Sequence, residues 1–317
     1  MNTGAVLGID TSCYTTSCAM VSKEHEVLAS VRLPLKVDRG ERGLRQSEAV
    51  FQHVRQLPLV LEQALGRANR PAILAVCASG APTDREASYM PVFTTGLSYA
   101  QGIAQALGVP CFSTSHQLGH FAAAGIGLKA LPAAHLGMHL SGGTTETVLI
   151  KESQSRLINA TRDISAGQLI DRIGVAMGLS FPAGEALEKL AQACEATGRY
   201  PAVFKEDAVS FSGVEAAALR DLAAGMPGPM IAAELFDCIA RAALKMGLAA
   251  YEATGVDTLL ITGGVASSAL LRRLMKSRCL KRGLPLRLHF GQQQYAGDNA
   301  AGVAVIGLEK LNQALEV

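Results

Sequence analysis

The stretch VLGIDTSCYTTSCAMV, which runs from Val6 to Val21, places a polar turn between two apolar runs. The apolar runs predict two β-strands, and the Asp, Ser, Thr and Cys residues between them predict a tight turn. Residues 135–160, HLGMHLSGGTTETVLIKESQSRLINA, repeat this plan, and in both copies a charged turn and a third strand follow. Two copies of one meander, about 130 residues apart, indicate a duplicated domain.

The segments between and after the meanders complete the pattern. Helical spacing of apolar residues predicts helices, and short continuous apolar runs predict buried strands. The expected helices are 47–65, 96–107, 166–176, 185–196 and 231–254, and the expected strands are 72–80 and the start of 258–275, where a Gly-Gly turn and a further helix follow. The order βββαβα, found twice, is that of the actin-like, sugar-kinase and heat-shock ATPase architecture, an α/β fold whose two domains face a nucleotide cleft. We expect domains at 1–125, completed by a C-terminal helix at 298–317, and at 126–297.

Composition and charge restrict the class of protein. Lys and Arg number 29 while Asp and Glu number 27, so net charge alone does not draw the chain to nucleic acid or to an anionic membrane. RNA contact would need a local basic patch, for which Leu271–Gly283 and Arg39–Arg45 are candidates, although such runs are commonly solvated helix faces. The seven cysteines are scattered without a C-x-x-C pair, which favours reduced thiols. No apolar run reaches the ~18 residues of a membrane span, so we expect a cytoplasmic protein without a membrane partner.

The two hairpin turns have a composition that suits phosphate binding. Gly, Ser and Thr let backbone N–H groups and hydroxyls approach phosphate oxygens without steric obstruction. One such turn alone is commonly only a turn, but two in matching positions of a repeat favour paired phosphate-facing loops. Gly263 and Gly264, at the end of a buried apolar run, predict a third element for an adenosine or phosphate group.

Two histidine pairs have the same spacing but different meanings. His116 and His120 are four residues apart in a helical pattern, which brings both imidazoles to one helix face and permits them to chelate one ion. Two hydrogen-bonded histidines without a metal give the same spacing. Gln117 stands where a metalloprotease of the H-E-x-x-H type has its Glu, so that class is excluded. His135 and His139 fall on an expected strand, roughly 13 Å apart, and cannot chelate together.

With these motifs assembled, the chain resembles the TsaD/YgjD/Kae family over nearly its full length; older usage calls the family O-sialoglycoprotein endopeptidases or peptidase M22. The family's I-E-T-S-C-D-E-T appears as Ile9–Thr16, its H-x-E-G-H as His116–His120, and its S-G-G-H-T as Ser141–Thr145. The other matches are D-D-A-A-G-E-A-F-D-K at 163–172, Y-P-G-G at 181–184, F-S-F-S-G at 209–213, G-G-V-x-x-N-x-x-L-R at 263–272 and T-D-N-G at 297–300. Both their order and their spacing agree with the family.

The resemblance implies a metal-dependent transferase with a two-domain actin-like (ASKHA) fold. Such an enzyme transfers a threonylcarbamoyl group from an acyl-adenylate to the exocyclic nitrogen of the tRNA adenosine beside the anticodon. Its partners are tRNA and the other subunits of the threonylcarbamoylation machinery, and its cofactors are one divalent metal ion, iron or zinc, and an adenine nucleotide or acyl-adenylate. The implied metal ligands are His116, His120 and Asp298, which with Asp10 form the expected catalytic set. The implied nucleotide contacts are Ser141, Gly142, Gly143, Asp171 on the ribose, Gly184, Gly263, Gly264 and Ser268.

Several positions depart from the family pattern. Asp10 replaces Glu, Tyr14 and Thr15 replace an acidic pair, Leu118 replaces Glu, Thr144 replaces His, Ser268 replaces Asn, and 81–93 replaces a Gly-rich loop. These changes leave two further functions open: a paralogue that carries out nucleotide-dependent carbamoyl-type transfer to another acceptor, and a non-catalytic scaffold subunit. The retained metal-ligand set argues against the scaffold, and no nucleophile and base arrangement supports a protease. The identity of the metal, the acyl donor and acceptor, and the oligomeric state stay open.

Overall fold

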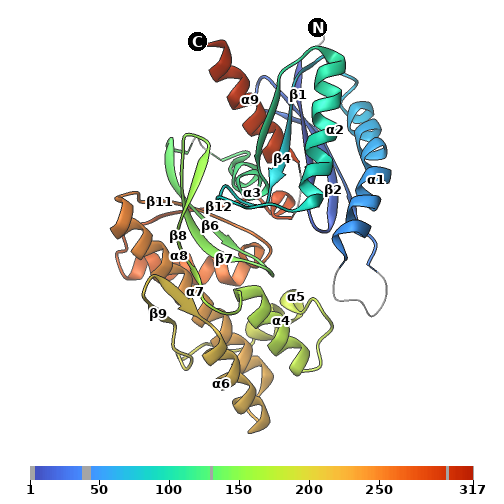
Figure 1. Cartoon of the computed structure of the whole chain (residues 1–317). Coiled ribbons are helices and arrows are strands. Elements are labelled where there is room, and N and C mark those ends of the chain that lie inside the picture. Colours follow the sequence, from blue (N-terminus) through green and yellow to red (C-terminus); the bar gives the residue numbers. More distant parts are fainter. Residues whose placement is uncertain (1–3, 38–43, 129–130, 298–299, 317) are drawn as a thin grey trace. The chain divides into compact units, whose positions relative to one another are not determined.

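The structure is a computed structural model that describes residues 4–37, 44–128, 131–297 and 300–316. It divides into two compact units (Figure 1). Unit 1 comprises Met1–Gly127, Ser153–Ser155 and Gly297–Val317, and unit 2 comprises Leu128–Glu152 and Arg156–Ala296. Among the described residues, no helix is both long and apolar enough to cross a membrane.

Unit 1 is built on a five-stranded sheet whose order is β3-β2-β1-β4-β5. The strands are β1 (Ala5–Thr11), β2 (Thr15–Ser22), β3 (Val27–Pro34), β4 (Ile73–Ala81) and β5 (Cys111–Ser115). β1, β2 and β3 form the predicted antiparallel meander, in which Asp10 pairs with Ser17 and Thr11 with Thr16. β4 and β5 then add in parallel, so their carboxyl ends lie at the same edge as the end of β1.

Helices cover both faces of this sheet, which explains why every residue of β1 is buried. α1 (Gln46–Arg67) and α2 (Pro91–Leu107) pack on one face, where Leu7 and Ile9 contact residues such as Leu57 and Ala100. α3 (His116–Gly125) and α9 (Ala301–Leu315) belong to the other face, where Val6 packs against α9. Figure 1 shows α1 and α2 on one side of the strands and α9 on the other.

Unit 2 contains a seven-stranded sheet of order β12-β11-β6-β7-β8-β10-β9. The strands are β6 (Ala134–Leu140), β7 (Thr145–Lys151), β8 (Gln154–Thr161), β9 (Val203–Lys205), β10 (Ala208–Ser210), β11 (Thr258–Thr262) and β12 (Arg287–Phe290). The order β8-β7-β6-β11-β12 repeats the order β3-β2-β1-β4-β5 of unit 1. β6 and β7 are antiparallel and β11 is parallel to β6, as in the first copy. The predicted duplication of the meander is therefore confirmed.

The helices of unit 2 are α4 (Ala166–Ala176), α5 (Gly184–Ala191), α6 (Ser212–Ala223), α7 (Gly228–Thr254) and α8 (Ala269–Lys281). α7 is buried along most of its length and forms the centre of the unit's core, with Phe236 and Met246 among its fully buried residues. One sequence prediction needs correction here. α5 ends at Ala191 rather than at 196, because the buried Glu234 on α7 accepts three backbone N–H groups from 197–199 and holds that segment as a loop. The helix predicted after the Gly-Gly pair is α8, which begins at Ala269 after a 3-10 turn at Val265–Ser267.

Candidate functional site

In unit 1, a buried carboxylate and two histidines form a connected chain of side chains. Asp10 is fully buried near the end of β1. Its Oδ1 accepts a hydrogen bond from the Ser79 hydroxyl on β4 and lies 2.9 Å from Nδ1 of His116, the first residue of α3. A carboxylate can only accept, so Nδ1 of His116 carries a proton and Nε2 keeps its lone pair. Asp10 therefore fixes both the tautomer and the orientation of His116.

The second histidine meets the first through the nitrogen that Asp10 leaves unprotonated. His116 and His120 lie one turn apart on α3, as predicted, and their Nε2 atoms are 3.1 Å apart. Metal ions bind imidazole nitrogens at about 2.0–2.1 Å, so nitrogens at this separation can share one ion. The donor set of these residues fits a metal, because a carboxylate behind a histidine ligand is a common outer partner in metal sites. Oδ2 of Asp10 is buried and has no hydrogen-bond partner among the described residues.

Asp298, the third predicted metal ligand, lies outside the described residues. Within the described part of the chain, no group of three or more His, Cys, Asp or Glu residues is placed to hold one metal ion. α9 begins three residues after Asp298, and it packs closely on α3. A Cβ on Gly302 of α9 would collide with the backbone of Gly119, which lies between His116 and His120. Both glycines therefore permit a close crossing of the two helices.

The turn between β1 and β2 is held in place by a histidine that the sequence analysis did not select. His53 on α1 is completely buried, and its Nε2 donates to the backbone carbonyl of Ser12 at 2.9 Å. Its Nδ1 lies 2.8 Å from the Thr16 hydroxyl at the start of β2. Burial lowers the pKa of His53, which favours its neutral form at pH 7. His53 thereby ties both limbs of the turn to α1.

In unit 2, the turn between β6 and β7 rests on the N-terminus of α4. The Ser165 hydroxyl donates to the Gly142 carbonyl at 2.7 Å, and the Gly167 N–H donates to the Ser141 carbonyl at 3.1 Å. A Cβ on Gly167 would lie 2.5 Å from Cα of Gly142, so this contact requires glycine. A Cβ on Gly142 or Gly143 would have no atom within 4 Å, so the outer side of the turn is open. Gly142 and Gly143 are both exposed.

The Gly-Gly pair after β11 lies beside this turn. Gly263 has a φ of +105°, and a Cβ there would collide with the carbonyl of Leu140, the last residue of β6. Because β6 and β11 are neighbouring parallel strands, both turns lie at the same edge of the sheet. This is the edge at which open α/β sheets bind their ligands. Gly263 serves close packing, whereas a Cβ on Gly264 would meet nothing within 4 Å.

The remaining predicted nucleotide contacts are Asp171, Gly184 and Ser268, and the hydrogen bonds around them involve the helices α4, α5 and α8. Asp171 on α4 accepts from the Ala183 N–H at 2.8 Å, next to Gly184, where α5 begins. Ser268 caps α8 by accepting from Leu271, and Glu188 on α5 accepts from Leu270 at 2.8 Å. Glu188 thus ties the middle of α5 to the first turn of α8. All eight predicted contact residues belong to unit 2.

Positions that depart from the family pattern have distinct surroundings. Tyr14, in the place of an acidic residue, is 51% exposed at the tip of the first turn. Leu118, in the place of Glu, is buried on α3. Thr144 donates its backbone N–H to the Ser141 hydroxyl at 3.0 Å and so closes the second turn. The sequence signals missed Ser79 and His53, which lie far along the chain from the turn they contact, whereas the Ser165–Gln168 capping box could have been found from its S-x-x-Q spacing.

Comparison with known proteins agrees with this architecture. Residues 26–305 match the family model described as TsaD: tRNA N6-adenosine threonylcarbamoyltransferase. The protein of that name from a strain of Thermus thermophilus is 31% identical over 305 residues, which cover 95% of this chain and 91% of the relative. The protein of that name from Moorella thermoacetica is 29% identical, with 93% and 89% covered.

Solved structures show the same fold at low identity. HypF of T. kodakarensis aligns with a TM-score of 0.66 at 13% identity, covering 99% of this chain and 48% of that one. A ROK family glucokinase from Streptomyces griseus, solved with glucose and AMPPNP, aligns with a TM-score of 0.56 at 13% identity, covering 96% and 100%. These likenesses confirm the predicted actin-like fold, and the names of the sequence relatives agree with the predicted transferase class. The chain belongs to the TsaD family of tRNA N6-adenosine threonylcarbamoyltransferases.

Proposed function

We propose that this protein transfers a threonylcarbamoyl group from an acyl-adenylate to the tRNA adenosine adjacent to the anticodon, with the help of a metal ion. The observation that carries the proposal is the Asp10–His116–His120 chain, in which two imidazole nitrogens converge at 3.1 Å. Family membership over residues 26–305 supports the reaction class. Partner subunits of the threonylcarbamoylation machinery and a cytoplasmic location remain predictions.

The residues that would hold the metal are His116 and His120 through Nε2, with Asp298 as the third ligand. α9, which follows Asp298, packs on Gly119 between the two histidines, and this supports that assignment. Imidazole with carboxylate suits iron or zinc. The ion would act as a Lewis acid that polarises the acyl and phosphate oxygens. Asp10 keeps the proton of His116 on Nδ1 and thereby presents Nε2.

The nucleotide part of the donor would bind in unit 2. Gly142, Gly143 and Gly264 are exposed, and their lack of side chains leaves room for phosphate oxygens to approach the backbone. Asp171 is proposed to accept from a ribose hydroxyl while its Oδ1 holds Ala183. Gly184 and Ser268 begin the neighbouring helices, whose N-terminal ends favour an anionic ligand.

A second candidate function is transfer of a carbamoyl-type group to another acceptor. The observation that favours it is the first turn, where an exposed Tyr14 stands in place of an acidic residue beside the Asp10 site. An aromatic ring at that point would change which acceptor fits, while the histidine pair and the second turn keep their geometry.

A reconstituted assay tests these proposals. It combines the protein with threonine, bicarbonate, ATP, an adenylate-forming partner enzyme, the family's other subunits and unmodified tRNA, and detects threonylcarbamoyl-adenosine by nucleoside mass spectrometry. We expect product with the wild type, and none with His116→Asn or His120→Asn. The matched control is His25→Asn, because His25 is an exposed histidine in the β2–β3 turn with a φ of +62° that Asn tolerates. Absence of wild-type product would favour the other acceptor or the scaffold role.

A further inference from the structure

The charges of this chain are distributed unevenly along its sequence. From Thr258 to Gly297 there are seven Arg and Lys residues and no Asp or Glu. The whole chain has 29 basic and 27 acidic residues, so the rest of it carries 22 basic and 27 acidic residues. The near-neutral total therefore conceals a basic segment on an otherwise acidic chain. This segment comprises β11, α8 and β12 of unit 2.

Three of the seven basic residues are held by hydrogen bonds or ion pairs. Arg272 donates to the carbonyls of Ala266 and Gly291, Arg278 pairs with the buried Asp237, and Arg287 pairs with Asp257. The other four are exposed: Arg273, Lys276, Lys281 and Arg282. None of these four has an ion-pair partner among the residues that the structure describes. We call them the α8 basic face.

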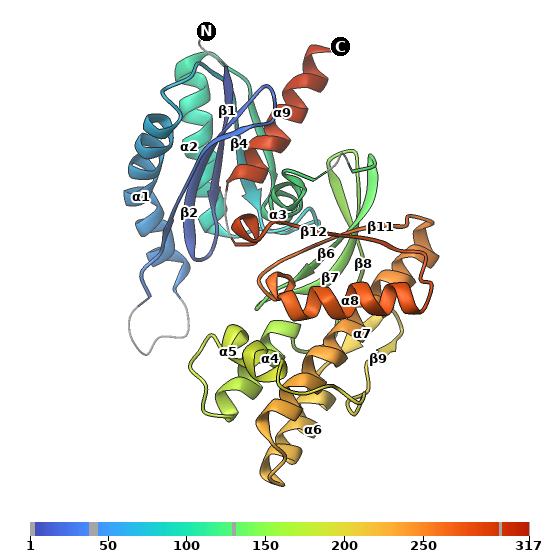
Figure 2. The same ribbon diagram turned by 180° about the vertical axis from the view of Figure 1, so that it is seen from behind.

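Helix electrostatics explain only part of this face. Lys281 lies in the last turn of α8, where a cation stabilises the negative end of the helix dipole. Arg273 is the fifth and Lys276 the eighth of the thirteen residues of α8, so neither lies in its last turn and neither serves the helix dipole there. Lys276 Nζ lies 5.4 Å from the centre of the Phe290 ring, a cation–π contact that leaves the side chain exposed. Figure 2 shows α8 at the front of unit 2, where no helix of that unit passes over it.

The spacing of the face suits an extended polyanion. Arg273 and Lys281 are eight residues apart, which is about 12 Å along a helix axis. Lys276 lies between them in sequence and about 60° from Arg273 around the helix axis. Lys281 and Arg282 extend the positive charge around the C-terminal end of the helix. The large apolar side chain exposed on α8 is Leu280, and the sequence of α8 contains no aromatic residue. Protein interfaces are depleted in Lys and enriched in aromatic residues, whereas phosphate-binding surfaces are rich in Lys and Arg.

We propose that the α8 basic face binds the phosphate backbone of RNA and so holds the tRNA acceptor. The proposal rests on the proposed function for the identity of that RNA. Contacts of this kind position the nucleic acid without reading its sequence. Binding by this face should therefore weaken with salt and depend little on which tRNA is offered.

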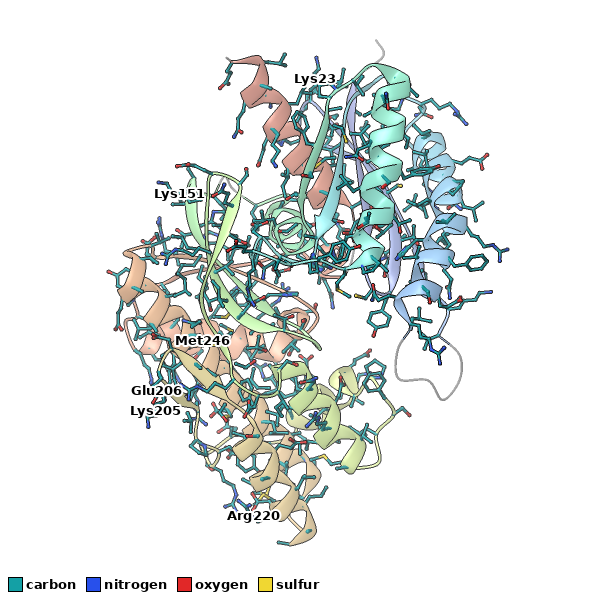
Figure 3. All side chains as sticks on the ribbon, viewed as in Figure 1. Lys23, Lys151, Lys205, Glu206, Arg220 and Met246 are labelled. Atoms are coloured by element: carbon teal, nitrogen blue, oxygen red, sulfur yellow. The ribbon has the colours of Figure 1, made fainter. Side chains whose placement is uncertain are left out.

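The test is tRNA affinity of the chain measured over a series of salt concentrations. The variant is Arg273→Gln/Lys276→Gln/Lys281→Gln. The matched control is Lys151→Gln/Lys189→Gln/Lys205→Gln, which changes net charge equally at exposed lysines of unit 2 that each have an acidic partner. Figure 3 labels Lys151 and Lys205, the latter beside its partner Glu206. Circular dichroism melts confirm that both variants fold.

We expect the α8 variant to lose affinity on the order of ten- to a hundredfold near 0.15 M salt, and its log K against log salt slope to flatten by about 2 to 3. The control should keep the wild-type slope. Three results would each overturn the proposal. The α8 variant could keep the wild-type salt slope, or the control could lose as much tRNA affinity as the α8 variant. The third such result is a wild-type protein that does not bind tRNA at low salt. A variant that binds tRNA normally but loses an acidic protein partner would also overturn the proposal.

The reconstituted assay separates this proposal from the proposed function. If the wild type forms threonylcarbamoyl-adenosine while the α8 variant binds tRNA normally, only the RNA surface is wrong. If the wild type forms no product while the α8 variant loses salt-dependent RNA binding, the surface stands and only the proposed reaction is wrong.

Discussion

The two meanders share one sequence plan, yet their turns are held by different means. The first turn is fixed by side chains, since His53 on α1 binds both Ser12 and Thr16. The second turn is fixed largely by the start of α4, where Ser165 and the Gly167 N–H bind its carbonyls. The two meanders thus share one backbone plan, while the contacts that hold their turns differ. The side-chain support accompanies a buried carboxylate and two histidines, and the helix-start support accompanies two exposed glycines, Gly142 and Gly143.

The largest expected loss of stability comes from a substitution that disturbs only the second turn. Gly167→Ala would place a Cβ 2.5 Å from Cα of Gly142 and 2.6 Å from the Ser141 carbonyl oxygen. Both obstacles are backbone atoms, so we expect a loss of about 3 kcal/mol in the free energy of unfolding. Urea denaturation measures it. Gly142→Ala, which meets nothing within 4 Å, is the control, and an equal loss in both variants would refute the packing argument.

A reciprocal experiment separates the two sites. Asp10→Asn removes the carboxylate behind His116, and we expect metal affinity to fall about 10- to 100-fold with nucleotide affinity unchanged. Asp171→Asn should weaken adenine nucleotide binding and leave metal affinity intact. Metal competition titration and calorimetry provide the two readouts. If either variant alters both affinities equally, the sites are not independent in the way the two turns suggest.

A smaller effect is expected at the cap of α4. Ser165→Ala removes the hydroxyl that accepts from the Gln168 N–H and donates to Gly142. Loss of such a cap costs about 1 kcal/mol. Ser165→Thr retains the hydroxyl and should recover most of that stability in thermal melts. A Thr variant as unstable as the Ala variant would show that the cap is not the cause.

The smallest expected effect is a pH dependence that arises at the first turn. Burial lowers the pKa of His53 from its ordinary value of 6.5, so the unfolded chain binds the proton more readily than the folded one. The contribution of His53 to stability is therefore fully present above pH 6.5 and is lost as the pH falls below 6.5. His53→Gln should be less stable at pH 7.5 and should lose less stability between pH 7.5 and 5.5. An equally steep decline in both proteins would contradict this assignment.

Local patterns predicted much of the fold. The two apolar runs that flank the polar turn placed the first meander correctly, and the four-residue spacing placed His116 and His120 on one helix. Predictions failed where a distant residue overrode local preference. Glu234 ends α5 early by binding the backbone of the following loop, and no pattern within 185–196 contains that information.

The candidate site was predictable only in part. His116 and the second turn carried recognisable motifs, but Ser79 and His53 reach the first turn from other elements. Their roles depend on the packing of β4 and α1 against β1 and β2. Ser and His at those positions carry no spacing signal, so only the folded chain reveals them.

The close crossing of α3 and α9 has a consequence for biosynthesis. α9 supplies the apolar cover for Val6, Val21 and Ala75, yet all of unit 2 is translated between α3 and α9. The face of the first sheet that α9 covers therefore stays open on the ribosome while unit 2, nearly continuous in sequence, can already collapse. Contacts across such a long stretch form late and leave the nascent chain prone to aggregation until they close. The helix that bears the two histidines thus acquires its final support only after the greater part of the polypeptide has been made.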